Sequence, residues 1–298
     1  MNPREEGFLL LASHLGDPGR RVLTAAQLRQ LTRRMAAADL PAEDRELCLE
    51  DLLGLGYGAD MAVRILTLLS DGEVLQHYLH KGKLCGCAPL TRVSDGYPLI
   101  LRKRLGEESP GCFWIKGDRD ILSFPGIALV GSRDLAPENL AFAQAVGIRA
   151  AEMGLALISG NARGADRAAQ DACLDHGGRV ISIIADCLES QPQKERVLYV
   201  SEDGFDLPFS SQRALSRNRA IHSWGELTFV AQAKLGSGGS WVGTTQNLRA
   251  GWSTVVCFRD GSEAMDALEA QGAYLADIDD LHDMTAFLDP RSDLFHRQ

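Results

Sequence analysis

The sequence predicts an α/β protein in which a mostly parallel β-sheet, with helices on both faces, follows a small all-helical domain. Three observations support this prediction. Leucines recur at helical intervals over roughly the first 80 residues. From Ile127 onward, short β-rich runs alternate with helical segments, and two of these runs end in glycine-rich loops. We therefore predict a helical domain over residues 1–82 and the sheet domain over residues 83–298.

The N-terminal segment is predicted to be a small helical bundle. Its leucines lie at Leu9, Leu10, Leu11, Leu15, Leu28, Leu31, Leu47, Leu49, Leu52 and Leu53. Glycines and prolines at residues 17–20, at Leu40-Pro41 and at residues 54–58 supply the turns. The 54–58 stretch resembles a helix-hairpin-helix, which holds a DNA backbone through its amides. An ordinary interhelical turn is the preferred interpretation, because such turns commonly contain glycine.

Alternating strands and helices follow. Strands are predicted at residues 127–130, 155–159, 179–185, 199–201, 227–231 and 254–258. Their apolar runs are nearly continuous, as expected when helices cover both faces of a parallel sheet. Pro137-Glu138 is predicted to start a helix that Gly154 ends. Residues 263–289 are predicted to add a last helix and strand to this extended Rossmann-like sheet.

The charge is distributed unevenly along the chain. The net charge of −9 argues against nucleic acid as a partner, because phosphate binding depends on Lys and Arg. Residues 260–298, however, hold ten acidic and two basic residues, which leaves 29 basic against 30 acidic residues in 1–259. A local basic surface outside this acidic C-terminal segment is compatible with the composition. Without a span of ~18 apolar residues or a secretory signal, we expect a cytoplasmic protein with no membrane partner.

Cysteine and histidine patterns predict no metal site. The seven cysteines include no CxxC pair, so reduced structural thiols are expected, and Cys85-Gly86-Cys87 alone is a weak candidate for metal binding or oxidation. The histidines fall into no metal-ligand spacing, and no catalytic set is recognisable. We predict no metal, no cofactor and no catalytic residue.

Two strand ends are candidates for binding phosphate. Gly131, Ser132 and Arg133 follow the first strand, where glycine permits close approach and the two side chains supply donors; alone, this pattern is equally compatible with a turn. The next strand ends in Ser159, Gly160, Asn161, Ala162, Arg163, Gly164, Ala165 and Asp166. Amides at the following helix start and the Arg163 guanidinium can converge on one anion. Asp166 is interpreted mainly as a cap for these amides.

Two later segments complete the candidate site. In Arg217, Asn218 and Arg219, arginines two residues apart cannot share a helix face, so one can reach a ligand while the other braces a loop. With Lys194, Arg196 and Arg213 they predict a basic rim, for which the alternative is a solvated charged face. A glycine-rich turn then exposes amides at another helix start, at Ser237, Gly238, Gly239 and Ser240. The adjacent Trp241 either stacks on a base or packs in the core.

Taken in order, these motifs resemble the DprA/Smf family of DNA-processing proteins. The similarity runs from Asp95 to Ser240 and includes Asp95-Gly96-Tyr97-Pro98-Leu99, Trp114-Ile115-Lys116-Gly117-Asp118, residues 127–133, the loop from Ser159 to Asp166, Gly177-Gly178, Ser201-Glu202, Arg217-Asn218-Arg219 and the turn at 237–240. The resemblance implies a non-enzymatic, homodimeric protein that binds single-stranded DNA and loads a RecA-type recombinase. It also implies phosphate contacts from Arg133, Arg163, Arg217 and Arg219, with close backbone approach at Gly131, Ser159, Gly160 and Gly164.

The chain also departs from the family pattern. The family usually has an apolar residue where Asn161 stands, a His where Gln170 stands and a Thr where Gly243 stands. We expect these positions to lie in the ligand pocket of a divergent member.

Two functions from different classes are therefore considered. The first is a DprA-like single-stranded DNA-binding protein in DNA processing and recombination. The second is a Rossmann-like module that senses or cleaves a nucleotide-derived small ligand, with Asp166 or Glu202 as an acid/base residue.

Overall fold

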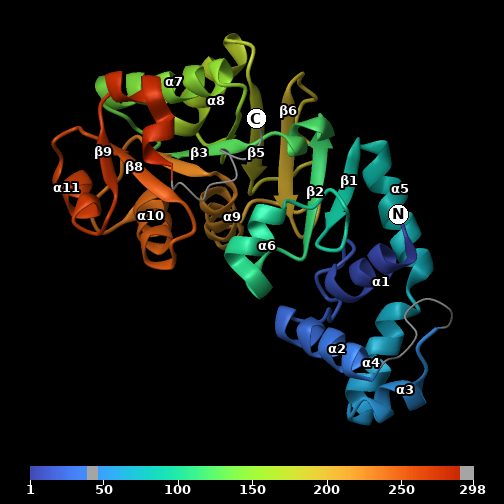
Figure 1. Ribbon diagram of the computed structural model, residues 1–298. Coiled ribbons are helices and arrows are strands. Elements are labelled where there is room, and N and C mark those ends of the chain that lie inside the picture. The colour runs from blue at the N-terminus through green and yellow to red at the C-terminus, as the bar shows by residue number, and fades with distance from the viewer. Residues whose placement is uncertain (39–45, 289–298) are drawn as a thin grey trace.

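A computed structural model describes residues 1–38 and 46–288, and in it one sheet of nine strands runs through the molecule in the order β1-β2-β6-β5-β4-β3-β7-β8-β9 (Figure 1). The predicted turn at Leu40-Pro41 and the last ten residues of the acidic segment lie outside the described residues. The strands are Cys87–Thr91 (β1), Cys112–Gly117 (β2), Gly126–Val130 (β3), Ala156–Ser159 (β4), Arg179–Ile184 (β5), Val197–Glu202 (β6), Leu227–Val230 (β7), Thr254–Phe258 (β8) and Tyr274–Ala276 (β9).

The strand predictions from Ile127 onward are confirmed. Strands β3 to β9 pair in parallel, whereas β1 and β2 add an antiparallel edge beside β6. The predicted final helix and strand are present as α11 and β9. Strands β1 and β2 were not predicted from the sequence. Strand β1 contains Pro89, which is tolerated because β1 is an edge strand.

The helices are Pro3–Ala12 (α1), Ala25–Ala37 (α2), Leu49–Gly54 (α3), Ala59–Leu69 (α4), Gly72–Leu84 (α5), Leu99–Leu105 (α6), Pro137–Glu152 (α7), Ala165–Asp175 (α8), Ser211–Trp224 (α9), Gly238–Ala250 (α10) and Glu263–Glu269 (α11). Three 3-10 segments add Gly106–Glu108 (η1), Arg119–Ser123 (η2) and Asp279–Phe287 (η3). As predicted, α7 begins at Pro137, and the chain leaves it through Gly154 with a φ of +68°. No helix in the described part of the chain is long and apolar enough to cross a membrane.

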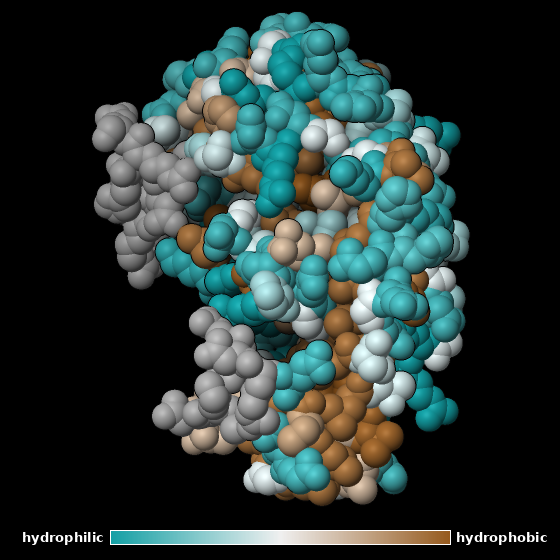
Figure 2. All heavy atoms as spheres, turned by 90° about the vertical axis from the view of Figure 1, so that its right-hand side faces the viewer, coloured by the Kyte–Doolittle hydropathy of each residue, from teal (hydrophilic) through white to brown (hydrophobic). Residues whose placement is uncertain are grey.

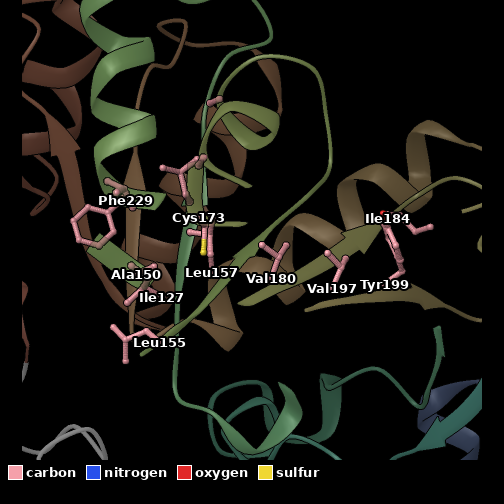
Figure 3. Packing of buried hydrophobic residues seen from close by; sticks show 14 of the residues in the cluster. Ile127, Ala150, Leu155, Leu157, Cys173, Val180, Ile184, Val197, Tyr199 and Phe229 are labelled. Atoms are coloured by element: carbon pink, nitrogen blue, oxygen red, sulfur yellow. The ribbon is translucent and has the colours of Figure 1, made fainter. Parts of the chain in front are cut away.

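Hydrophobic cores cover both faces of the sheet. On one face, α7 and α8 pack on the strands, and Figure 3 shows Ala150 and Cys173 from these helices beside Ile127, Leu157 and Phe229. The opposite core joins the strands to α6, α9 and α11. Two covered faces explain why the strand sequences are apolar throughout, and they leave the strand ends as the accessible part of the sheet.

The N-terminal helices divide between two cores. Helices α2, α3 and α4 form a small cluster around Leu31, Leu52 and Ile65, to which α1 contributes Leu11. Helices α1 and α5 instead pack on the sheet, where Leu9 and Tyr78 belong to the core that also contains Trp114. Figure 2 shows the side of the molecule that carries these helices, with hydrophobic side chains gathered over its lower half. The domain boundary between residues 82 and 83 stays a prediction.

The 54–58 segment joins α3 to α4 as an interhelical turn. The amide of Gly56 donates to the Leu53 carbonyl (2.9 Å), and the amide of Tyr57 donates to the Leu52 carbonyl (3.1 Å). Because these amides are used inside the turn, they are not available to a phosphate, which supports the ordinary-turn interpretation.

Candidate phosphate-binding groove

A groove of about 800 Å³ opens at the carboxyl ends of β3 and β7, between α9 and the start of α10. This is the edge at which parallel sheets bind ligands. The predicted site residues that line it are Gly131, Ser132, Arg133, Asp166, Arg217, Asn218, Ser237, Gly238, Gly239 and Ser240. The structure therefore brings together the first strand end, part of α9 and the glycine-rich turn, which lie far apart in the sequence.

Glycines allow two loops of the site to pack against each other. A side chain at Gly131 would overlap the Ala165 methyl group. Gly164 has a φ of +87°, and a side chain there would overlap the carbonyl oxygens of Ser132 and Arg133. Gly131 and Gly164 therefore allow two segments of the protein to pack closely against each other. Their surroundings do not support the expectation that they allow a ligand backbone to approach closely.

Asp166 ties the second loop to the start of α8. Its Oδ2 accepts hydrogen bonds from the amides of Gly160 (3.1 Å) and Ala162 (3.2 Å). Burial raises the pKa of this carboxyl group, although the neighbouring Arg217 guanidinium and the two amides favour its charged form. Asp166 thus accepts from amides of the loop before α8, and not from the first amides of the helix as predicted, so its acceptor capacity is largely committed to the loop.

Arg217 forms part of the groove wall and braces two strand ends. Its Nη1 donates to the carbonyl of Ile183 (2.9 Å) at the end of β5 and to the carbonyl of Gly160 after β4. Its Nε is buried and has no hydrogen-bond partner among the described residues. The side chain places a positive charge at the groove, while part of its guanidinium is used by the protein.

Arg219 points away from the groove, as the spacing argument predicted for one of the two arginines. Its Nη1 lies 3.5 Å from Oε2 of Glu108, outside the groove lining. Asn218, between the two arginines, lines the groove and donates from Nδ2 to the Gly239 carbonyl (3.4 Å). A phosphate contact from Arg219 in this groove is therefore not supported.

Arg133 and Arg163 differ in their partners. Arg163 is 75% exposed, and its Nη2 lies 2.7 Å from Oδ1 of Asp134, itself 89% exposed. Arg133 is exposed, lines the groove and has no ion pair within residues 1–38 and 46–288. Arg133 is thus free to take an anion, whereas Arg163 must first exchange an exposed and weak ion pair.

The start of α10 supplies free amides. Ser237, the residue before the helix, makes no side-chain capping hydrogen bond, and Gly238 has a φ of +85°. The first amides of a helix need an acceptor and carry the positive end of its dipole. Lys234, which is exposed, borders the same space and was missed from the sequence. It lies in the segment between β7 and α10, and no motif in the sequence marks it.

The predicted basic rim from Lys194 to Arg219 is wrong. Lys194 precedes β6 and lies beside Gly117 and Asp118 in a separate hollow of about 490 Å³, at the edge of the sheet opposite the groove. Arg196 borders the same hollow. Arg213 donates instead to the carbonyls of Ala185, Leu207 and Pro208 and to the Ser201 hydroxyl.

Two of the three departures from the family pattern lie beneath the surface. Gln170 is buried and donates to the hydroxyls of Ser159 (2.6 Å) and Ser182 (3.3 Å). Gly243 is buried against the ring of His222. The expectation that these positions lie in the ligand pocket is wrong, and the fully buried Ser159 likewise cannot present its hydroxyl to a ligand. Asn161 stands at the loop with a left-handed φ of +58°, outside the groove lining.

Trp241 packs in the core and does not line the groove. It is half-buried and packs, with Leu248 and Trp252, against the hydrophobic cluster that contains Val255. The core interpretation of this residue is therefore confirmed.

Two buried titratable groups, Glu202 and His222, do not line the groove. Glu202 is buried outside the groove lining, where burial raises its pKa to about 7 and the Ser216 hydroxyl donates to Oε2 (2.6 Å). Burial lowers the pKa of His222 to about 3. Among the described residues no cluster of His, Cys, Asp or Glu is placed to hold a metal ion.

Comparison with known proteins identifies relatives of the whole arrangement. A family model described as DNA recombination-mediator protein A matches residues 88–284. The DNA processing protein DprA of Streptococcus pneumoniae (strain ATCC BAA-255 / R6) is 29% identical over 198 residues, which cover 63% of this chain and 64% of that protein. The matched part is thus just under two thirds of the relative's length.

Two solved structures resemble the fold. The X-ray structure of DprA from Streptococcus pneumoniae has a TM-score of 0.71 and 25% sequence identity, covering 92% of this chain and 96% of that one. A structure describing the single-stranded DNA binding mode of DNA processing protein A from Helicobacter pylori has a TM-score of 0.57 and 20% identity, covering 68% and 97%. The second likeness concerns the fold alone.

Proposed function

Because the chain belongs to the DNA recombination-mediator protein A family, we propose that it is a non-enzymatic protein that binds single-stranded DNA in the groove and acts in DNA processing and recombination. The observation that carries the proposal is that the free Arg133 guanidinium and the uncapped start of α10 border the same groove. Both groups are of the kind that binds phosphate oxygens.

The DNA backbone would follow these polar groups. Arg133, Lys234 and the amides of residues 238–240 would receive phosphates, and Arg217 would add positive charge in the groove. Arg163 would join at the rim by exchanging Asp134 for a phosphate. These groups can bind DNA although the chain has a net charge of −9. Contacts to DNA phosphates act over a few ångströms, so the charges that border the groove matter more than the total charge of the chain.

Fluorescence anisotropy with a labelled single-stranded oligonucleotide tests the proposal across a series of salt concentrations. We expect binding that weakens with salt, and Arg133→Ala should lower the logarithmic salt slope by about 0.7, as for one lost phosphate contact to a single strand. Lys194→Ala is the matched control, since this exposed lysine lies at the opposite sheet edge. Undetectable binding of the unmodified protein at low salt would refute the proposal.

A nucleotide-derived small ligand is the competing function. The groove volume of about 800 Å³ falls within the range of small-ligand pockets. Cleavage is disfavoured, because Asp166 is held by backbone amides and Glu202 lies outside the groove. Thermal stabilisation by a mononucleotide, with none by an oligonucleotide, would favour this alternative over DNA.

A RecA-type recombinase and a second copy of the chain are the proposed protein partners. The recombination-mediator description of the family supports the first. The dimer is supported by the edge strand β9, where Tyr274 is exposed, and by the exposed side chain of Ile278 just after this strand. Sedimentation equilibrium of the full chain and of Tyr274→Ser tests the dimer, and recombinase filament growth on protein-coated oligonucleotides tests the mediator role. A concentration-independent monomer would exclude the dimer.

A further inference from the structure

The groove is lined by two chemically different kinds of group. Some are polar and suited to phosphate, namely Arg133, Lys234 and the amides at the start of α10. Others are apolar side chains that remain in contact with solvent: Phe209 is 53% exposed and Leu215 is 56% exposed. A nucleotide has the same division, with an anionic phosphate on one side and a flat, largely apolar base face on the other.

The backbone on both sides of Phe209 is held in place. Arg213 Nη1 donates to the carbonyls of Leu207 (3.0 Å) and Pro208 (2.8 Å) directly before it. Ser210, directly after it, caps α9 by accepting a hydrogen bond from the Arg213 amide (3.1 Å). The ring is therefore presented from a fixed segment, which limits the conformational entropy lost when a ligand binds.

The exposure of this ring has no explanation in the packing of the fold. Within the described residues, no other aromatic ring lies against Phe209, whereas Phe205, four residues earlier, is fully buried between Tyr78 and Trp114. A large aromatic side chain left half-exposed in a groove costs burial energy that a ligand can recover.

We propose that Phe209 stacks on an unpaired base of a DNA strand whose phosphates contact Arg133, Lys234 and the start of α10 in the same groove. The proposal rests on the proposed function and specifies how the same site recognises its substrate. A base that lies on Phe209 has left its own strand's stack and cannot be paired, so the contact selects single strands over duplex. It tolerates any sequence, because every base offers a π-face.

Abasic oligonucleotides test this contact in the full-length protein. Phe209→Ala is expected to weaken binding of an ordinary single-stranded oligonucleotide by about 5- to 100-fold, the effect of losing one stacked base. It should leave binding of an abasic oligonucleotide of equal length unchanged, together with the salt slope. Phe209→Trp should retain affinity. Leu235→Ala, which removes an exposed apolar side chain outside the groove lining, is the matched control.

The outcomes separate this inference from the proposed function. If the unmodified protein binds neither oligonucleotide, the proposed function fails, and the base contact fails with it. If it binds both, but Phe209→Ala leaves the ordinary oligonucleotide unaffected or weakens both equally, the base contact alone is wrong. Weakening confined to the base-containing strand supports it.

Discussion

Replacing Glu202 by glutamine should make the protein more stable at neutral and alkaline pH. Glu202 ends β6 with only 8% of its surface exposed, and its Oε1 is buried without a hydrogen-bond partner among the described residues. Burial raises the pKa of this carboxyl group to about 7 from an ordinary value of 4.5, against the opposing effects of the Ser216 hydroxyl and two arginines. The folded state therefore disfavours the ionised carboxylate, which is the form that an exposed glutamate takes at neutral pH.

The linkage between protonation and folding gives the sign and the size of the change in unfolding free energy with pH. Because the pKa is raised in the folded state, the stability that this group contributes is complete below pH 4.5 and is lost as pH rises through 7. The difference between the two pKa values corresponds to about 3 kcal/mol of unfolding free energy. Glu202→Gln has no such titration, and its side-chain oxygen can still accept the Ser216 hydroxyl hydrogen bond.

Urea unfolding at pH 4.5 and pH 8 measures this difference. The gain in stability of Glu202→Gln over the unmodified protein should be larger at pH 8 by about 3 kcal/mol, and costs common to both pH values cancel in that comparison. Glu138→Gln, at the exposed start of α7, is the control and should show no comparable change. A pH-independent difference between Glu202→Gln and the unmodified protein would refute the reasoning.

Other substitutions probe the scaffold of the groove. Gly164→Ala should lower the unfolding free energy by at least about 2 kcal/mol in urea titrations, because its φ of +87° and two nearby carbonyls oppose a side chain. Arg217→Met should cost about 3–5 kcal/mol, most of it at neutral pH, because Asp166 loses its buried cation. Glu107→Gln removes two exposed ion pairs, to Arg29 and Arg33, and thermal unfolding should show a loss below about 1 kcal/mol per pair.

The sequence predicted the parallel sheet well because each strand is buried on both faces and reads as an apolar run. It also predicted that the two glycine-rich loops lie at the ligand edge of the sheet. Ligands bind at the carboxyl ends of parallel strands, and applying this rule needs only the order of the strands. Lys194 was misplaced because the connection between β5 and β6 contains no helix and runs from one sheet edge to the other. Closeness in sequence therefore did not give closeness to the groove.

The sequence also did not predict how deeply individual side chains are buried. Gln170 lies on α8 near the loop that carries Arg163, but helical spacing gives a face and not a distance from solvent. Phe209 and Lys234 were missed because a lone aromatic residue or lysine in a connecting segment has no periodic pattern to mark it. Only the folded chain shows that both border one groove.

The division of the N-terminal helices between two cores determines which shortened versions of this chain can keep the sheet core covered. Helices α2 to α4 share one cluster, to which α1 adds only Leu11, while α1 and α5, before and after them, pack on the sheet. In topological terms, the α2–α4 unit is an insertion between two helices of the sheet domain. A truncation at residue 83 would strip Tyr78 from Trp114 and Phe205 and expose aromatic surface to aggregation. Excising α2–α4 and rejoining α1 to α5 by a short linker would preserve that surface and is the better route to a minimal version.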